Sequence, residues 1–380
     1  MSGDRVTFDF RKFFERDFFM LKFLGIYYLT ENAKIGQILY SFIVSLPLMV
    51  VATMVQIINM FCVEADLRKM AASGYLGASC LMAVIKELFL FKNKKFLLNI
   101  QNDMNRSEFQ PKDAEGVELV ERCLSGYKKT RKVVLIVCSI AVSGCLTMPF
   151  LSSTQLLPLS AWYPFDVTYS PVYELIYIHQ SVSLIYLAYM NIYIDILVSG
   201  FTTFVSLQCA LLCHKMESQR NINSVKEFVI HHKWILNFVF NIEKLITEMY
   251  FLQFSACTVI FCLSWFLLTM IDVNSFEFVY LFAYQTAIGS LLLIPCWYSS
   301  EMERQSQLIP FSVYSLPWRT NTHQFKKDVY FFLLGVQKPI FINIVGLFPL
   351  SVDTFTKILR SSFSYYTVLN NMNLKSQANN

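Results

Sequence analysis

Charged residues are scarce in this chain. Asp, Glu, Lys and Arg together account for 16% of its 380 residues, whereas soluble domains carry roughly 25%. Hydrophobic residues account for 55%, and the chain contains 35 Phe and 20 Tyr. This composition excludes an ordinary soluble domain and is typical of a membrane protein. The formal net charge of +5 does not indicate nucleic-acid binding, because the positive residues are distributed according to the membrane segments.

The sequence also lacks the short motifs of metal and catalytic sites. It contains no Cys-x-x-Cys pair, no His/Cys cluster with metal-ligand spacing and no His-Glu-x-x-His motif. Nine of the ten cysteines fall in apolar segments or on the expected cytoplasmic side, so we interpret them as small core residues. We therefore expect no enzyme activity, no metal site and no cofactor.

Long apolar stretches are the main feature that is present. About 20 apolar residues are needed to cross roughly 30 Å of hydrocarbon. Stretches of this kind occupy 35–63, 70–91, 133–157, 171–213, 249–271 and 278–300. Each predicts a transmembrane helix, so the expected fold is an all-α polytopic membrane protein. Lys86 lies near the inner end of the second stretch, where its side chain can extend to the membrane surface. For Asp195, near the inner interface, we expect a structural ion pair rather than an ion-binding site.

Positive charge is concentrated in regions that alternate along the chain. Of the 32 Lys and Arg residues, 27 lie before residue 37, at 86–132, at 215–244 or at 304–338. Because positive residues accumulate on the cytoplasmic side of short membrane loops, this distribution assigns a side to every span. It predicts a cytoplasmic N-terminus and, with seven spans, an external C-terminus.

Several helices are expected to extend beyond the membrane. The fourth span has no Gly or Pro cluster and would reach roughly 60 Å at about 1.5 Å per residue. A helical pattern begins near Val225 and continues into the fifth span, and an amphipathic helix lies near 324–336. These extensions predict a cytoplasmic helical bundle used for assembly, although long surface helices would give the same pattern.

The last segment is unusually polar for a membrane span. Residues 339–352 carry no charge, but Asp353, Lys357 and Arg360 follow at i, i+4 and i+7 and share one helix face. Ionisable groups cost several kcal/mol in lipid, so this face must meet protein or water. Several copies around an axis would form a pore. Alternatively, the segment is a surface helix, which leaves six spans and a cytoplasmic C-terminus, and composition alone does not decide between the two.

Two separate motifs resemble signatures of the insect odorant receptors, of a mosquito-like or other dipteran type. One is the external loop Leu157-Pro158 with Trp162-Tyr163-Pro164-Phe165-Asp166. The other is C-terminal and runs through Ser351-Val352-Asp353-Thr354-Phe355, Ile358-Leu359, Ser361, Ser364-Tyr365-Tyr366-Thr367 and Leu369. The resemblance extends over the whole chain, because its length, seven spans and inner N-terminus also agree with this family.

The resemblance implies an odorant-gated, non-selective cation channel of four subunits whose seventh helix lines the pore. It places the last helix through the membrane, with its C-terminal end at the outer gate. On this basis we expect the gate at Val368 and Leu369, with Val368 at the narrowest point and Asn371 at the mouth. An apolar ring of this kind stops ions by dewetting.

The apolar stretches and the charge distribution, with the last helix placed by the resemblance, give the expected division of the chain. It comprises a cytoplasmic N-terminal segment (1–34), helices 1–4 (35–213), a cytoplasmic link (214–248), helices 5–6 (249–300), a second cytoplasmic link (301–338), the pore-lining helix (339–369) and an external tail (370–380). The short link between spans four and five implies a ligand-tuning subunit that forms a heterotetramer with a co-receptor. The expected location is the plasma membrane of an olfactory neuron dendrite. The expected contacts are a small volatile ligand and membrane lipid, but not nucleic acid.

In that family the odorant pocket lies in the outer half of the bundle, among spans two to six. Small volatiles offer few hydrogen bonds, so affinity should come from apolar and aromatic contact. No counter-charge is evident in the outer half, which predicts a neutral ligand. The candidate lining residues are Tyr75, Thr147, Phe150, Leu151, Thr154, Tyr177, Ser181, Trp265, Leu268, Tyr280 and Tyr284.

Two other receptor classes are alternatives. A gustatory-type receptor channel of the same superfamily ends in a different motif, which the stretch Tyr365-Tyr366-Thr367-Val368-Leu369 does not match. A G-protein-coupled seven-helix receptor needs an external N-terminus, which the charge distribution opposes. The Asp-Arg-Tyr and Asn-Pro-x-x-Tyr motifs of that class are also absent.

Overall fold

The computed structural model describes residues 8–26, 35–36, 39–40, 43, 46–62, 67–151, 157–218 and 224–379. Over these residues the chain is almost entirely helical, as expected. The helices are α1 (Arg11–Phe23), the π-helix η2 (Leu46–Val51), α3 (Ala52–Cys62), α4 (Leu67–Lys92), α5 (Lys94–Asp103), the 3-10 turn η3 (Ser107–Phe109), α6 (Ala114–Leu151), α7 (Val172–Ser218), α8 (Lys226–Leu268), α9 (Phe276–Ser306), α10 (Ile309–Tyr314), α11 (His323–Gly335) and α12 (Val352–Asn379). A two-residue hairpin, β1 (Asn343–Ile344) and β2 (Phe348–Pro349), precedes α12.

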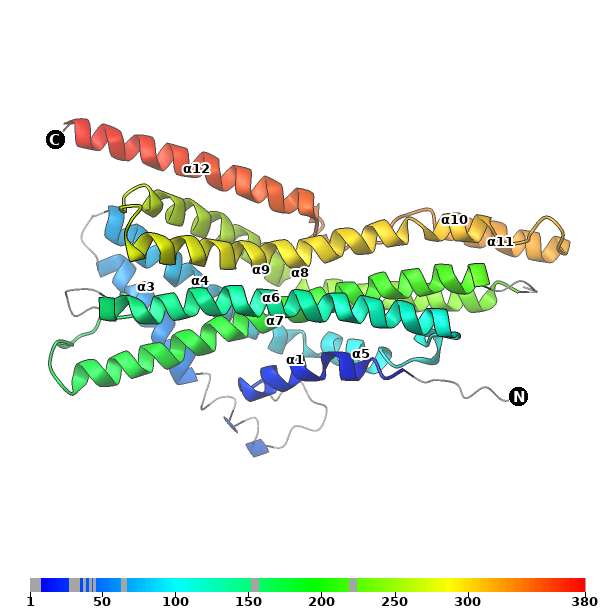
Figure 1. Cartoon of the computed structure of the whole chain (residues 1–380), viewed down its shortest axis with the longest axis horizontal. Helices are drawn as coiled ribbons and strands as arrows, with labels where there is room; N and C mark the ends of the chain where they lie inside the picture. Colours follow the sequence, from blue (N-terminus) through cyan, green and yellow to red (C-terminus); the bar gives the residue numbers. More distant parts are fainter. Residues whose placement is uncertain are drawn as a thin grey trace.

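The long helices form an elongated bundle (Figure 1). The starts of α7 and α9 and the ends of α6, α8 and α12 lie together at one end of the bundle. Helices α10 and α11, the end of α7 and the start of α8 lie toward the other end. The loops assigned to one side of the membrane from charge are thus grouped at one end of the molecule.

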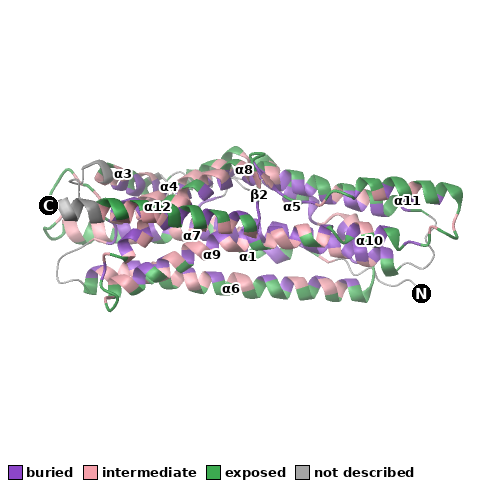
Figure 2. Cartoon of the chain, turned by 90° about the horizontal axis from the view of Figure 1, so that it is seen from above, coloured by how far each residue is buried: buried purple, intermediate pink, exposed green. Residues whose placement is uncertain are grey.

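Helix α7 is the centre of the bundle. In its most apolar window 89% of residues are buried, against 28% in the corresponding window of α6. Figure 2 shows the difference, because α6 presents an exposed face along the side of the bundle. At about 1.5 Å per residue the 47 residues of α7 extend about 70 Å, far beyond a membrane thickness. The expectation of one continuous helix through α8 is also confirmed.

Five helices in the described part of the chain, α4, α6, α7, α8 and α9, are long and apolar enough to cross a membrane. Around the first expected span the described apolar helix is shorter, at Pro47–Asn59, and residues 37–38, 41–42 and 44–45 lie outside the description. Helix α12 has the length of a span, with 28 residues, but is too polar to meet the same criterion.

The expected start of the last helix at Pro339 is wrong, because α12 begins at Val352. Residues preceding it form the β1–β2 hairpin, which turns through the positive-φ residues Val345 and Gly346. The hairpin is attached to α8, since the backbone N–H of Val345 donates to the Thr247 hydroxyl at 2.6 Å. The apolar character of 339–351 therefore reflects packing of an extended segment against the bundle, which composition does not distinguish from a helix.

Helix α1 is held against α6 and α7 by a buried polar cluster. The Asp17 carboxylate pairs with Arg131 of α6 at 3.0 Å, and the Tyr127 hydroxyl donates to the Ile196 carbonyl of α7 at 2.9 Å. Gly200 makes this packing possible, because a Cβ atom at this position would lie 2.5 Å from the Phe14 ring and 2.7 Å from the Tyr127 oxygen.

Candidate ligand pocket and pore helix

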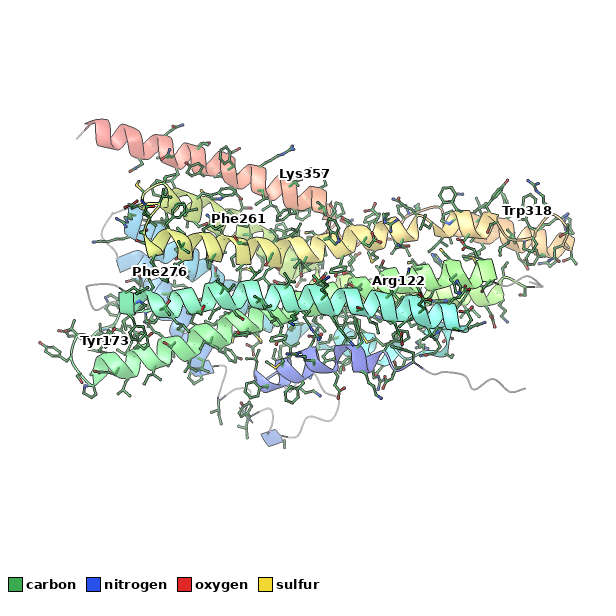
Figure 3. All side chains as sticks on the ribbon, in the orientation of Figure 1. Arg122, Tyr173, Phe261, Phe276, Trp318 and Lys357 are labelled. Atoms are coloured by element: carbon green, nitrogen blue, oxygen red, sulfur yellow. The ribbon has the colours of Figure 1, made fainter. Side chains whose placement is uncertain are left out.

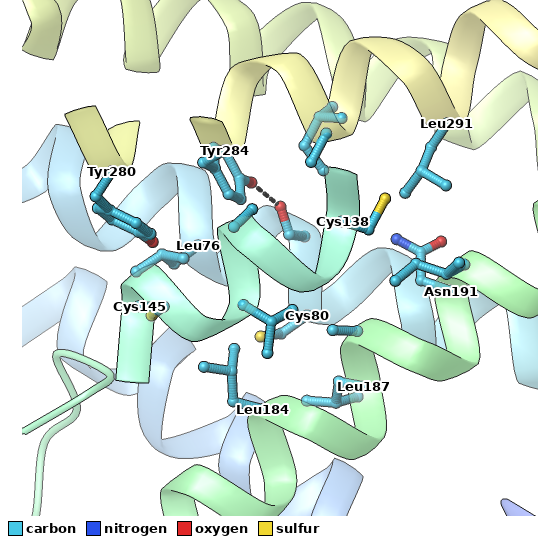
Figure 4. Close-up of a pocket in the computed structure, with 17 residues that line it drawn as sticks. Leu76, Cys80, Cys138, Cys145, Leu184, Leu187, Asn191, Tyr280, Tyr284 and Leu291 are labelled. Carbon is cyan, nitrogen blue, oxygen red and sulfur yellow. Dashed lines mark hydrogen bonds between the residues drawn. The ribbon is translucent and has the colours of Figure 1, made fainter. Parts of the chain in front are cut away.

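A small cavity lies inside the bundle among α4, α6, α7 and α9 (Figure 4). Its volume is about 80 Å³. The lining is mostly aliphatic and thiol-bearing, so it is suited to an apolar ligand. The lining residues are Leu76, Ser79, Cys80, Cys138, Ala141, Val142, Cys145, Leu184, Leu187, Ala188, Asn191, Ile192, Tyr280, Tyr284, Ala287, Ile288 and Leu291.

The cavity exists because small residues recur on the inner face of α6. Cys138, Ala141 and Cys145 follow the i, i+3, i+7 spacing of one helix face, and all are buried. On α9, Tyr280, Tyr284 and Ala287 face them with similar spacing. Short side chains on α6 leave a space that the larger residues of α9 do not completely fill.

The outer wall of the cavity is a cluster of tyrosines. The rings of Tyr75 on α4 and Tyr284 on α9 meet edge to face, with centroids 4.9 Å apart. The hydroxyls of Tyr75 and Tyr280 are 3.5 Å apart, and Tyr284 forms a short hydrogen bond with Ser79. Ser79 also donates to the Tyr75 carbonyl at 3.0 Å. The hydroxyl groups around the cavity are therefore hydrogen-bonded to one another.

The loop after α6 covers this end of the cavity. Leu159 is 1% exposed and belongs to the same apolar cluster as Tyr280 and Tyr284. Its backbone N–H donates to the Gln180 side chain of α7 at 2.9 Å. Cys145 donates to the Pro158 carbonyl, with sulfur and oxygen 3.6 Å apart. The described part of this loop is thus packed down onto the bundle.

The inner end of the cavity is bounded by a buried ion pair. Lys86 of α4 contacts Asp195 of α7 at 2.7 Å, and both side chains are almost completely buried. Tyr250 and Gln253 of α8 also donate to this carboxylate, each at 3.1 Å. The structural ion pair expected for Asp195 is confirmed. The expectation that Lys86 extends to the membrane surface is wrong, because the fixed carboxylate satisfies its charge inside the bundle.

Asn191 connects the cavity with this ion pair. It lines the cavity, and its side-chain oxygen accepts a short hydrogen bond from Lys86. A second, smaller cavity of about 20 Å³ lies on the inner side and is bordered by Asn191, Asp195 and Gln253. The cavity is therefore apolar along its length and polar at its inner end.

Of the ligand-contact residues expected from sequence, Tyr280 and Tyr284 line the cavity, and Tyr75 lies directly behind them. Tyr177 and Ser181 lie on α7 toward its outer end, and the Tyr177 hydroxyl donates to the Leu146 carbonyl at 2.9 Å. Thr147, Phe150 and Leu151 are exposed on the outside of α6. Trp265 packs against Phe363 of α12, and Leu268 lies at the end of α8. Thr154 lies outside the described residues.

Sequence reasoning missed most of the lining because it chose another face of α6 and, on α7, positions on the same face but too near the outer end. The α6 lining follows the buried stripe Cys138–Ala141–Cys145, whereas Thr147, Phe150 and Leu151 are exposed, and the Phe150 ring contacts Tyr177 outside the cavity. The repeat of small residues at helical spacing was the available signal. On α8, no described residue lines the larger cavity.

Helix α12 packs mainly against α8 and α9, and one of its faces is exposed (Figures 1 and 3). Lys357 pairs with Asp353 at 2.7 Å, as its spacing indicates, and both side chains are exposed. Val368 is 58% exposed and Asn371 is also exposed, whereas Leu369 packs against the bundle. The uncovered stripe of α12 comprises Asp353, Lys357, Arg360, Ser364, Val368 and Asn371.

The family model described as 7tm Odorant receptor matches residues 66–363, which is most of the chain. The chain belongs to the odorant receptor family. Its relatives include Odorant receptor 10 of Aedes albopictus, which is 26% identical over 80% of this chain and 84% of the relative. Odorant receptor Or2 of Anopheles gambiae is 22% identical over 87% of this chain and 92% of the relative. This receptor is therefore a multi-pass membrane protein of the insect olfactory system and not an enzyme.

Solved structures have the same fold as this odorant receptor. The olfactory receptor OR5 of Machilis hrabei in complex with eugenol superimposes with a TM-score of 0.86, at 16% identity, over 95% of this chain and 98% of that one. The structure of OR5 described without eugenol gives a TM-score of 0.85, at 17% identity, over 94% and 97% of the two chains. The helical arrangement is thus retained at low sequence identity.

Proposed function

We propose that this receptor is the ligand-tuning subunit of an odorant-gated cation channel and that a small neutral volatile binds in the cavity among α4, α6, α7 and α9. The cavity is the observation that carries this proposal. It lies between four helices, its walls are aliphatic and aromatic, and the charges at its inner end neutralise each other. An uncharged, largely apolar ligand fits such a site because no net charge is available to stabilise an ionised one.

The pore belongs to α12 in this proposal. The uncovered stripe of this helix is partly ionisable, and in a single chain it has no protein partner among the described residues. Four subunits around an axis would remove the stripe from lipid and surround a water-filled path with it. Val368 then forms the apolar constriction and Asn371 the mouth. Leu369 anchors the helix to its own subunit instead.

Assembly with co-receptor subunits is assigned to the end of the bundle that contains α10 and α11. The helices extend well beyond membrane thickness there, and α11 presents exposed Tyr330, Phe331 and Leu334 (Figure 2). On this assignment that end is cytoplasmic and α12 ends outside the cell. The site of action is the plasma membrane of an olfactory neuron dendrite.

A recording experiment tests the channel function. The receptor would be expressed with and without a co-receptor, G-protein signalling blocked, and whole-cell currents recorded during an odorant panel. We expect an odorant-evoked cation current that needs the co-receptor and persists during the block. Currents that disappear with G-protein signalling would contradict the proposal.

The pocket is tested by filling it. Ala141→Phe places a ring in the cavity and should abolish responses to every active odorant. Ser143→Phe on the exposed side of the same helix is the control and should leave them intact. Surface expression is measured for both variants. Equal responses of the two variants would place the ligand elsewhere.

A further inference from the structure

Most polar groups around the cavity already have partners. Ser79, Tyr75, Tyr280 and Tyr284 hydrogen-bond to one another, and Cys145 donates to the Pro158 carbonyl. Only the Tyr280 hydroxyl, which accepts from Tyr75, donates to none of them, and Figure 4 shows Tyr280 at the far side of the cavity from Asn191. A polar atom of an odorant at the inner end of the cavity therefore needs another partner there, or it loses its hydrogen bonds to water without replacement.

Asn191 has a free donor, and its orientation is fixed. The ammonium group of Lys86 can only donate, so the Asn191 atom facing it must be the amide oxygen. The amide nitrogen is consequently turned away from Lys86. Figure 4 shows this nitrogen on the side of the cavity that the other lining residues enclose. Among the described residues, none accepts a hydrogen bond from it.

The buried ion pair makes this arrangement rigid. Asp195 holds Lys86 at 2.7 Å and is itself held by Tyr250 and Gln253 of α8. A reversal of the Asn191 amide would place its N–H₂ group against the ammonium and lose the Lys86 hydrogen bond. The donor therefore points permanently into an otherwise apolar cavity.

We propose that Asn191 determines specificity by donating a hydrogen bond to its ligand, and that the ligands of this receptor carry a neutral hydrogen-bond acceptor, such as a carbonyl or ether oxygen, at one end of an apolar body. This inference rests on the proposed ligand site. The acceptor lies at the inner end of the cavity, and the apolar body lies against Cys138, Leu184 and Tyr284.

Matched odorant pairs test this preference. Acetophenone and α-methylstyrene have the same shape, but the first has a carbonyl where the second has a methylene group, and benzaldehyde and styrene differ similarly. One net hydrogen bond makes the carbonyl compound more potent by up to about tenfold in evoking current. In Asn191→Leu, whose side chain has a similar volume without polar atoms, the potency ratio within each pair should fall to about one.

Leu184→Val is the matched control, because it changes the volume of the same cavity without altering its polarity. It should shift the potency of both members of a pair together and retain their ratio. Surface labelling and unfolding temperature of the purified variants establish that each one folds, and Lys86 retains Asp195 as a partner in Asn191→Leu.

Three results would overturn the role of Asn191. These are equal potency of both pair members on the unmodified receptor, a ratio that is unchanged in Asn191→Leu, and silence toward every acceptor-bearing probe. A different result would contradict the proposed ligand site itself, because Ala141→Phe would then leave the odorant responses intact. An effect of Ala141→Phe together with an unchanged ratio in Asn191→Leu refutes only the hydrogen bond.

Discussion

At the scale of single residues, the buried charges are the most informative feature. Lys86 and Asp195 lie deep in an apolar bundle, where an isolated charge would cost several kcal/mol. Asn191 of α7 and Tyr250 and Gln253 of α8 complete the hydrogen bonds of the ion pair, so its cost is offset only while all of them are present. Such a network couples three helices at the inner end of the ligand cavity.

Removal of one member of the Lys86–Asp195 pair should therefore lower the stability of the receptor strongly. We expect Lys86→Met to destabilise the receptor by about 3–5 kcal/mol, because Asp195 is left as an uncompensated buried charge. Lys92→Met is the control, since it breaks an exposed pair with Glu248 and should cost only about 0–1 kcal/mol. Thermal unfolding of the detergent-purified variants measures both effects. Similar losses of stability in the two variants would contradict the expectation that the buried ion pair contributes more than the exposed one.

Gly200 gives a second prediction at this scale. In Gly200→Ala the new methyl group collides with Phe14 and Tyr127, so α1 must move or detach, at a cost of about 1–3 kcal/mol. Gly126→Ala on α6 should be neutral or stabilising, because nothing lies within 4 Å of its added Cβ atom. Limited proteolysis of α1, together with the unfolding temperature, distinguishes the two. Intact docking of α1 in Gly200→Ala would contradict the close packing.

At the scale of elements, the long apolar helices could be predicted from sequence, but the faces that they present could not. The length and hydropathy of the apolar stretches predicted α4, α6, α7, α8 and α9, and the positions of charged residues predicted where these spans end. Which side of α6 faces the interior depends on the packing of α7 and α9 against it, and hence Thr147 and Phe150 were expected inside although they are exposed. The predicted start of α12 was wrong for a related reason, since an apolar extended segment and an apolar helix have the same composition.

The uncovered stripe of α12 leads to a prediction about gating. Val368→Asp introduces a charge into the proposed apolar constriction, which hydrates it and should give a current in the absence of odorant. Tyr365→Asp is the control, because Tyr365 is also exposed on α12 but lies away from the stripe. Recordings at matched surface expression compare the two variants. An odorant-independent current in both, or in neither, would count against Val368 as the gate.

At the scale of the whole molecule, the charge distribution and the shape of the bundle agree. Among the described residues, the loop before α7 and the loop between α8 and α9 lie at the opposite end of the structure from α10 and α11. Partnership with a co-receptor remains a proposal, because its evidence would lie in contacts between chains. The ligand class required side-chain geometry, since the orientation of Asn191 follows from Lys86, which is 105 positions away in the sequence.

Orientation in the membrane can be tested on the complete receptor. An epitope tag added after Asn380 should be labelled by antibody on intact cells, whereas a tag before Met1 should be labelled only after permeabilisation. A cytoplasmic marker protein controls for membrane integrity. Labelling of the N-terminal tag on intact cells would reverse the proposed topology.

The exposed face of α12 also has a consequence for the biosynthesis of the receptor, before it reaches the cell surface. If the channel assembles as proposed, a newly made subunit without partners presents Asp353, Lys357 and Arg360 on the exposed face of a helix that packs mainly against α8 and α9. Ionisable groups in that position are costly against lipid, so the unassembled subunit should be retained and degraded during biosynthesis. The supply of partner subunits, rather than transcription of this chain, would then set the number of functional receptors in a neuron.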